Sequence, residues 1–262
     1  EDPARLFDRP VAAALVLALI VTRWIYPYPT MAIYELMLLA LVFPILRLLP
    51  RILKPQMRSP LYALAALFVF DRLHELAVGQ PLLHRVLLLV PGMFGIALFA
   101  WTSLQRRHGV KTRMGNLVTV LMQAAVVALS TALVANLVGA VALARLLTTA
   151  VLVSAFLGIV FFAAVLVLDT LINLSFGIRT QTPALPSRLH VEAMGRWSRI
   201  VVHVAALALW VRMTLVLFGA YHLLMRGVTL LLARRWRFGQ FDVSIGEVLT
   251  FAVVLTIGYA LS

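Results

Sequence analysis

The sequence predicts an all-α integral membrane protein, a polytopic helical bundle of about eight transmembrane helices plus one interfacial amphipathic helix. Of the 262 residues, 63% are hydrophobic and 13% are charged, whereas a soluble domain is about half apolar and about a quarter charged. Apolar runs near the ~20 residues that cross a bilayer recur along the chain. Most Lys and Arg residues lie in short segments between these runs, as is typical of the loops of membrane proteins.

The expected spans cover residues 10–26, 31–49, 60–78, 82–104, 116–138, 141–176, 197–218 and 243–261. The third is the weakest, because the charged stretch DRLHE (71–75) interrupts its apolar run. The sixth is longer than a ~30 Å hydrocarbon core requires, so we expect it to tilt, to bend near Gly158 or to project into water. Small side chains in AAVVALSTALVA (124–135) favour close contacts between the fifth helix and its neighbours.

Residues 220–237 differ from the spans and are expected to form an amphipathic helix in the headgroup plane. At helical spacing, one face collects His222, Arg226, Thr229, Ala233 and Arg237, and the other Leu224, Val228, Leu231 and Leu232. The alternative is a further spanning helix, which would reverse the direction of the last span.

The distribution of Lys and Arg predicts the orientation. Fourteen of these residues fall at the start and in segments 47–58, 105–113 and 179–199, on one side of the predicted topology, and five fall on the other. The richer side is expected to be cytoplasmic, which places the N-terminus of the segment inside. Segment 179–189, with two prolines, is then a cytoplasmic linker after the first six helices.

The inventory of reactive residues argues against an enzyme. The chain contains no cysteine, its six histidines are scattered, and neither HExxH nor a glycine-rich phosphate motif occurs. We therefore expect no catalytic residues, no cofactor and no metal site. The net charge of +13 does not indicate a nucleic-acid partner, because the basic residues lie mainly in the loops between spans.

Three groups of polar residues have both a functional and a structural interpretation. DRLHE (71–75) is either a proton or substrate site, or a helix end whose charges neutralise one another. Arg212 can snorkel toward lipid phosphates or pair with a carboxylate on another helix. Asp169 and Asn173, one turn apart, can hydrogen-bond to a neighbouring helix.

The C-terminal stretch FGQFDVSIGEVLTFAVVLTIGYALS (238–262) resembles the entry to the channel core in large members of the small-conductance mechanosensitive channel (MscS) family. The matching residues are Gly239, Val243, Ser244, Ile245, Gly246, Glu247, Val248 and Leu249, with Ser262 as the Ser of a closing Ser-Arg pair. LWVRMTLVLFGAYHLL (209–224) and, less specifically, RLFDRPVAAALVL and FPILRLLPRIL are similar to other segments of these proteins.

The resemblance implies a multi-pass protein of a bacterial inner membrane that senses membrane tension and protects against hypoosmotic shock. It implies membrane lipids as partners and a homo-oligomer, a heptamer in this family. Residues 1–218 would form a peripheral sensor paddle, and 219–262 the interfacial helix and first core helix. The segment is then expected to be part of a longer chain.

Two other classes of protein stay open, a polytopic secondary transporter and a non-conducting membrane scaffold. The residues expected to meet lipid or to affect gating are Arg212, Arg226, Arg234, Arg235, Arg237 and Asp169.

Overall fold

The protein is described here from a computed structural model. The described residues are 10–25, 31–53, 55–76, 81–107, 113–180, 188–232, 235–238, 241–244, 251 and 254. The chain divides into two compact units, Glu1–Thr214 and Leu215–Ser262.

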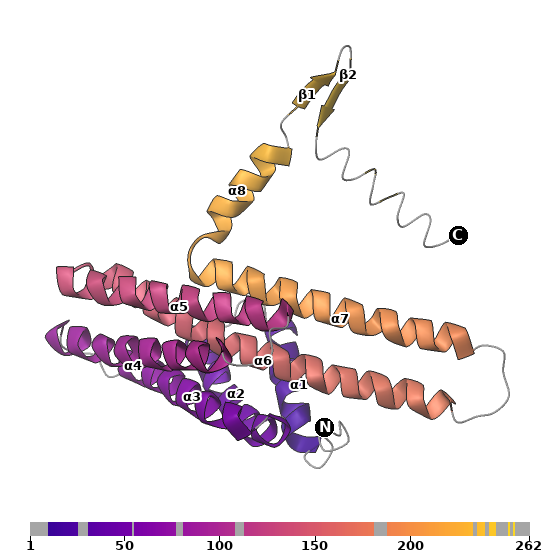
Figure 1. The fold of residues 1–262 in the computed structure, drawn as a ribbon, viewed down its shortest axis with the longest axis horizontal. Coiled ribbons are helices and arrows are strands. Elements are labelled where there is room, and N and C mark those ends of the chain that lie inside the picture. Colours follow the sequence, from indigo (N-terminus) through magenta and orange to yellow (C-terminus); the bar gives the residue numbers. More distant parts are fainter. Residues whose placement is uncertain are drawn as a thin grey trace. The chain divides into compact units, whose positions relative to one another are not determined.

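Eight α-helices make up nearly all of the described chain (Figure 1). They are α1 (Pro10–Ile25), α2 (Met31–Ile52), α3 (Pro55–Leu76), α4 (Pro81–Arg107), α5 (Arg113–Val138), α6 (Val141–Thr180), α7 (Arg188–Leu217) and α8 (Tyr221–Leu232). The predicted helical class is confirmed, apart from one hairpin of two short strands, β1 (Arg235–Phe238) and β2 (Phe241–Ser244).

Four helices in the described part of the chain are long and apolar enough to cross a membrane. These segments are Arg85–Gln105, Asn116–Val138, Val141–Asn173 and Gly195–Leu217. The predicted number of about eight spans is therefore not supported. The expected last span would begin at Val243, but Val243 and Ser244 belong to strand β2. Of the rest of that predicted span, the structure describes only Phe251 and Val254, which are helical.

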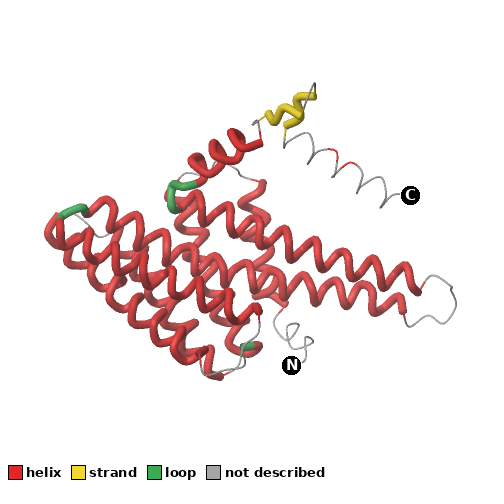
Figure 2. Tube along the Cα trace, turned by 45° about the horizontal axis from the view of Figure 1, so that its top comes forward, coloured by secondary structure: helices red, strands yellow, loops and turns green. Residues whose placement is uncertain are grey.

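Helix α6 is the central element of the first unit. In the segment Val141–Asn173, more than half of the residues of the most apolar stretch are buried by the rest of the protein. They are buried because α1 to α5 all pack against α6. The ring of Phe156 on α6 stacks on Phe68 of α3 with centroids 4.1 Å apart. Near the other end, Val167 packs with Ala12 and Ala13 of α1 and Leu48 of α2. The course of α6 between its neighbours can be followed in Figures 1 and 2.

Helices α4 and α5 form the closest antiparallel pair, and their contact uses small residues. Ala132 and Ala135 of the predicted small-residue stretch are buried. Gly95 of α4 lies so near Leu129 of α5 that an added Cβ would come within 2.8 Å of the Leu129 Cδ1 atom. The expectation of close helix contacts along residues 124–135 is thus confirmed for its second half, from Leu129 to Ala135.

Helix α5 turns directly into α6 at Gly139, which has a positive φ of 97°. A backbone of this kind favours glycine, because it has no Cβ. Arg85 and Asn136 fasten the turn to α4 through a reciprocal pair of 3.0 Å hydrogen bonds, each side chain donating to the other residue's carbonyl oxygen.

Helix α7 runs beside α6 in the opposite direction, as both views show (Figures 1 and 2). The indole Nε1 of Trp210 donates a 2.9 Å hydrogen bond to the carbonyl oxygen of Ser154 on α6. The indole fits over Gly158, where an added Cβ would come within 3.1 Å of Nε1. Gly158 does not interrupt α6, which is one helix of 40 residues. At 1.5 Å per residue α6 is ~60 Å long, roughly twice the thickness of a hydrocarbon core.

In the second unit the predicted helix 220–237 is wrong in its extent. Helix α8 ends at Leu232, and Arg235 and Arg237 lie on strand β1. Strands β1 and β2 are antiparallel, and their register pairs Arg235 with Ser244, Trp236 with Val243, Arg237 with Asp242 and Phe238 with Phe241. The register thus pairs polar residues with polar ones and apolar residues with apolar ones.

Candidate functional site

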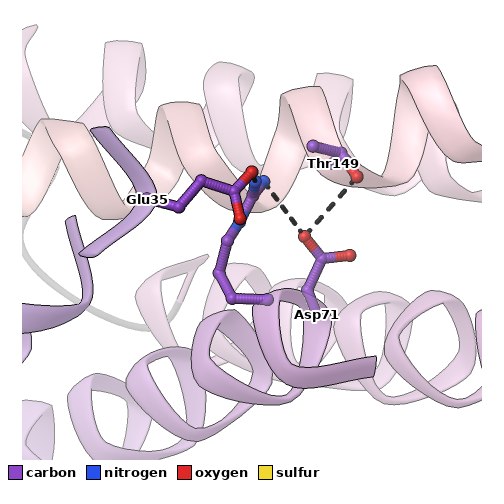
Figure 3. Close-up of polar contacts among 4 residues, drawn as sticks. Glu35, Asp71 and Thr149 are labelled. Carbon is purple, nitrogen blue, oxygen red and sulfur yellow. Dashed lines mark hydrogen bonds and ion pairs between the residues drawn. The ribbon is translucent and has the colours of Figure 1, made fainter. Parts of the chain in front are cut away.

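An ion cluster formed by Glu35, Asp71, Arg72 and Thr149 joins three helices in the interior of the first unit (Figure 3). Arg72 on α3 contacts both carboxylates. Its Nη1 atom lies 3.2 Å from Glu35 Oε1 on α2, and its Nη2 atom lies 3.3 Å from Asp71 Oδ2. Thr149 of α6 donates to the same Asp71 oxygen at 3.5 Å. The cluster therefore ties α2, α3 and α6 together at one end of the bundle.

The cluster is shielded from the surroundings by the packed helices. The side chain of Asp71 is fully buried, and those of Arg72 and Glu35 are 7% and 16% exposed. The Arg72 guanidinium also lies 5.7 Å from the centroid of Phe68, within the range of a cation–π contact. Because a charge removed from water costs several kcal/mol, these mutual contacts are what make the burial of three ionisable groups tolerable.

The sequence pointed to part of this cluster. Asp71 and Arg72 belong to DRLHE, and the structure confirms that charges of this stretch neutralise one another. The expectation of a helix end does not describe them fully, because both residues are buried among helices. The side chains of His74 and Glu75 lie outside the described residues. The sequence analysis did not identify Glu35 as a partner of these charges. In the sequence Glu35 is marked out only as a single carboxylate within an apolar run.

A second polar contact joins α6 to α7. Asp169 Oδ2 on α6 lies 3.4 Å from His203 Nε2 on α7. The predicted contact of Asp169 with a neighbouring helix is therefore confirmed, with a histidine as the partner. Asn173, one turn further along α6, is exposed.

The basic residues that the sequence singled out are distributed over several elements of the described chain. Arg212 lies on α7 and Arg226 on α8, and both are exposed. Arg235 and Arg237 lie on strand β1, and Arg234 lies outside the described residues. Their predicted contacts with lipid stay predictions.

The crevice that the packed helices leave between α4, α5 and α6 offers no room for a ligand. This crevice, lined by Leu88, Gly92, Ala132, Asn136 and Thr148 among others, is too narrow to hold a water molecule. Among the residues that the structure describes, no three His, Asp or Glu side chains come together as a metal site would require. The ion cluster is therefore the strongest candidate site within the first unit.

Comparison with known proteins adds no relative. No family model matches the chain, and no curated protein or solved structure is significantly similar to it.

Proposed function

We propose that this chain is the tension-sensing transmembrane region of a mechanosensitive channel of the small-conductance family. It belongs to a multi-pass protein of a bacterial inner membrane, with a cytoplasmic N-terminus, about eight spans and a homo-oligomeric, heptameric assembly. It protects the cell against hypoosmotic shock and has no catalytic activity. The observation that carries the proposal is the resemblance of residues 239–249 to the entry of the channel core.

The surface of the helices supports a role in lipid contact. The apolar segment Gly195–Leu217 of α7 is long enough to span a membrane, and no residue in its most apolar stretch is buried inside the protein. Such a surface requires hydrocarbon or another membrane helix around it. Helix α8 exposes Leu224 and Val228 on one face, and His222, Arg226 and Thr229 lie on the opposite face, as in an interfacial helix.

Tension would act through this contact. Stretching a membrane favours whichever conformation occupies more area in its plane, so a lipid-facing group of helices biases a closed–open equilibrium. The arginines at 226, 234, 235 and 237 would meet lipid phosphates and couple the second unit to the headgroups.

The proposal is tested on the complete gene product. An immunoblot of native membranes with an antibody against this segment should detect a protein much heavier than the 29.0 kDa of these residues. Patches from spheroplasts that express that protein should show currents when suction is applied. Neutral residues at 234, 235 and 237 should shift the suction threshold, whereas a neutral residue at the exposed Arg58 on α3 serves as a matched control. A 29.0 kDa product without suction-activated current would overturn the proposal.

The buried ion cluster favours a second candidate, a secondary transporter. Ionisable residues inside a membrane bundle often mark a proton or ion pathway, and Glu35 and Asp71 are such carboxylates. In proteoliposomes with an imposed membrane potential and an internal pH-sensitive dye, a transporter should move protons, and Glu35→Gln with Asp71→Asn should stop the movement. A tension sensor should give no proton flux in either form.

A further inference from the structure

Both ring nitrogens of His203 face an acceptor oxygen. The Nε2 atom lies 3.4 Å from the Asp169 carboxylate, and the Nδ1 atom lies 2.8 Å from the carbonyl oxygen of Arg199, one turn earlier on α7. A carbonyl oxygen can only accept, and so can an ionised carboxylate. A neutral imidazole has one N–H, so next to an ionised Asp169 it can satisfy only one of these two contacts.

We propose that Asp169 and His203 form a proton-binding clasp, which joins α6 to α7 when the pair takes up one proton. The proton can sit on the ring, so that an imidazolium donates to both oxygens. It can instead sit on the Asp169 carboxyl group, which then donates to Nε2 while Nδ1–H donates to Arg199. Both arrangements contain the same number of protons and satisfy both contacts. The clasp goes beyond the proposed channel function and does not rest on it.

The environment of Asp169 supports this assignment. Its Oδ1 atom is buried and has no hydrogen-bond partner among the described residues. A carboxylate oxygen without a donor is poorly stabilised, so the negative charge of Asp169 depends on the His203 contact. Removal of the shared proton leaves the pair with a net negative charge, while Asp169 Oδ1 has no hydrogen-bond donor among the described residues.

Among the described side chains, the other charged groups near this end of α6 and α7 do not form contacts that replace either partner. On α7 they are Arg196 and Arg199, and the Arg199 Nε atom donates to the carbonyl oxygen of Gly195 at 3.3 Å. From α1, Ala12, Ala13 and Leu17 pack beside Val167, and none of them titrates. On α2, Arg47 lies over the Phe43 ring. Glu35 and Asp71, the other carboxylates whose side chains are described, belong to the ion cluster at Thr149. Thr149 lies 20 residues before Asp169 on α6, or ~30 Å away.

Helix α7 is the element that such a clasp can release. No residue in the most apolar stretch of α7 is buried against the rest of the chain. Packing within the protein therefore contributes little to the position of this helix. The hydrogen bond from Trp210 to Ser154 is one attachment, and the clasp lies two turns away on the same helix. Loss of the clasp therefore frees the end of α7 next to Arg199 while Trp210 remains seated over Gly158.

The chain contains no native cysteine, so spin labels at Asn173→Cys on α6 and Ile200→Cys on α7 report the separation of the two helices without interference. Electron–electron distances are measured on this chain in lipid nanodiscs between pH 5 and pH 8. We expect a short, narrow distance distribution at pH 5 and a longer, broader one at pH 8. The ratio of docked to undocked helix should change by about tenfold, as expected for one charge-assisted hydrogen bond.

His203→Gln and Asp169→Asn should each make the distance independent of pH. His222→Gln on α8 is the matched control, because His222 is an exposed histidine in the second unit; it should leave the pH response unchanged. A distance that does not respond to pH in the unsubstituted chain overturns the clasp. A response that persists in both His203→Gln and Asp169→Asn overturns it as well.

Discussion

At the scale of single residues, the burial of charge is the main feature that separates this protein from a simple apolar bundle. The pairing of Arg72 with two carboxylates from different helices fixes how α2 and α3 meet. Sequence reasoning identified the charges on α3, because they interrupt an apolar run. It could not identify Glu35 as their partner, since that pairing depends on how two helices are brought together in three dimensions.

Replacement of Arg72 by methionine should destabilise the protein strongly. The substitution leaves the fully buried carboxylate of Asp71 and the half-buried carboxylate of Glu35 without their guanidinium. Breaking a buried ion pair in this way typically costs about 3–5 kcal/mol. Unfolding in detergent micelles, followed by circular dichroism, measures the loss.

Two further variants show whether the loss comes from unpaired charge. The triple variant Glu35→Gln, Asp71→Asn, Arg72→Met removes every charge of the cluster and should recover most of the stability. Arg226→Met, at an exposed position on α8, should change stability by less than about 0.5 kcal/mol. A single Arg72→Met variant as stable as the original protein would show that the cluster has no structural role.

Two glycines on α4 should respond in opposite ways to the same substitution. A Cβ at Gly95 would lie 2.8 Å from Leu129 Cδ1, and Leu129 is fully buried, so Gly95→Ala should cost about 1–3 kcal/mol by overpacking. A Cβ at Gly92 would meet Leu133 at an ordinary 3.7 Å. Gly92→Ala should therefore stabilise the protein by up to about 1 kcal/mol, because alanine has a higher helix propensity than glycine. Thermal unfolding of both variants under identical conditions compares them, and equal effects would contradict the close contact of α4 with α5.

At the scale of elements, helix positions were predicted well and the hairpin of β1 and β2 was not. Helices α1 to α7 lie where the apolar runs predicted helices, because length and composition dominate in such segments. The error at 235–237 came from placing Arg237 in a helical period. The alternation Arg-Trp-Arg-Phe, followed after Gly239 and Gln240 by Phe-Asp-Val-Ser, has the period of two that a hairpin requires.

Helix α8 offers a test of its own at Gly227. This residue lies inside the helix, and nothing stands within 4 Å of an added Cβ. Gly227→Ala should therefore stabilise α8 by up to about 1 kcal/mol, seen as slower hydrogen exchange of its amides. Gly219→Ala is the matched contrast, because Gly219 has a positive φ of 68°, where a side chain costs roughly 1–2 kcal/mol. Equal exchange in the two variants would argue against a helix that begins after this turn.

At the scale of the whole molecule, the number of spans is the question on which sequence and structure diverge. The four helices that satisfy both length and composition lie in α4 to α7. Helix α3 is also 22 residues long, but its charges lower its apolar character. Asp71 and Arg72 are paired and buried in the bundle, which reduces the cost of placing them in a membrane. We therefore expect α3 to cross the membrane although its composition alone does not indicate it.

Single cysteines at three exposed positions decide between the two topologies, because the chain has no native cysteine. Ser59→Cys lies before most of α3, Gln105→Cys near the end of α4, and Ala140→Cys in the turn between α5 and α6. If α3 to α6 all cross, Ser59 and Gln105 lie on the side rich in Lys and Arg, and Ala140 lies on the opposite side. An impermeant maleimide added to right-side-out vesicles should then label only Ala140→Cys. If α3 does not cross, Ser59→Cys should react together with Ala140→Cys, because α4 and α5 return the chain to the side on which it started. If only Gln105→Cys were labelled, the orientation of the chain would be the opposite of the one that the basic residues predict.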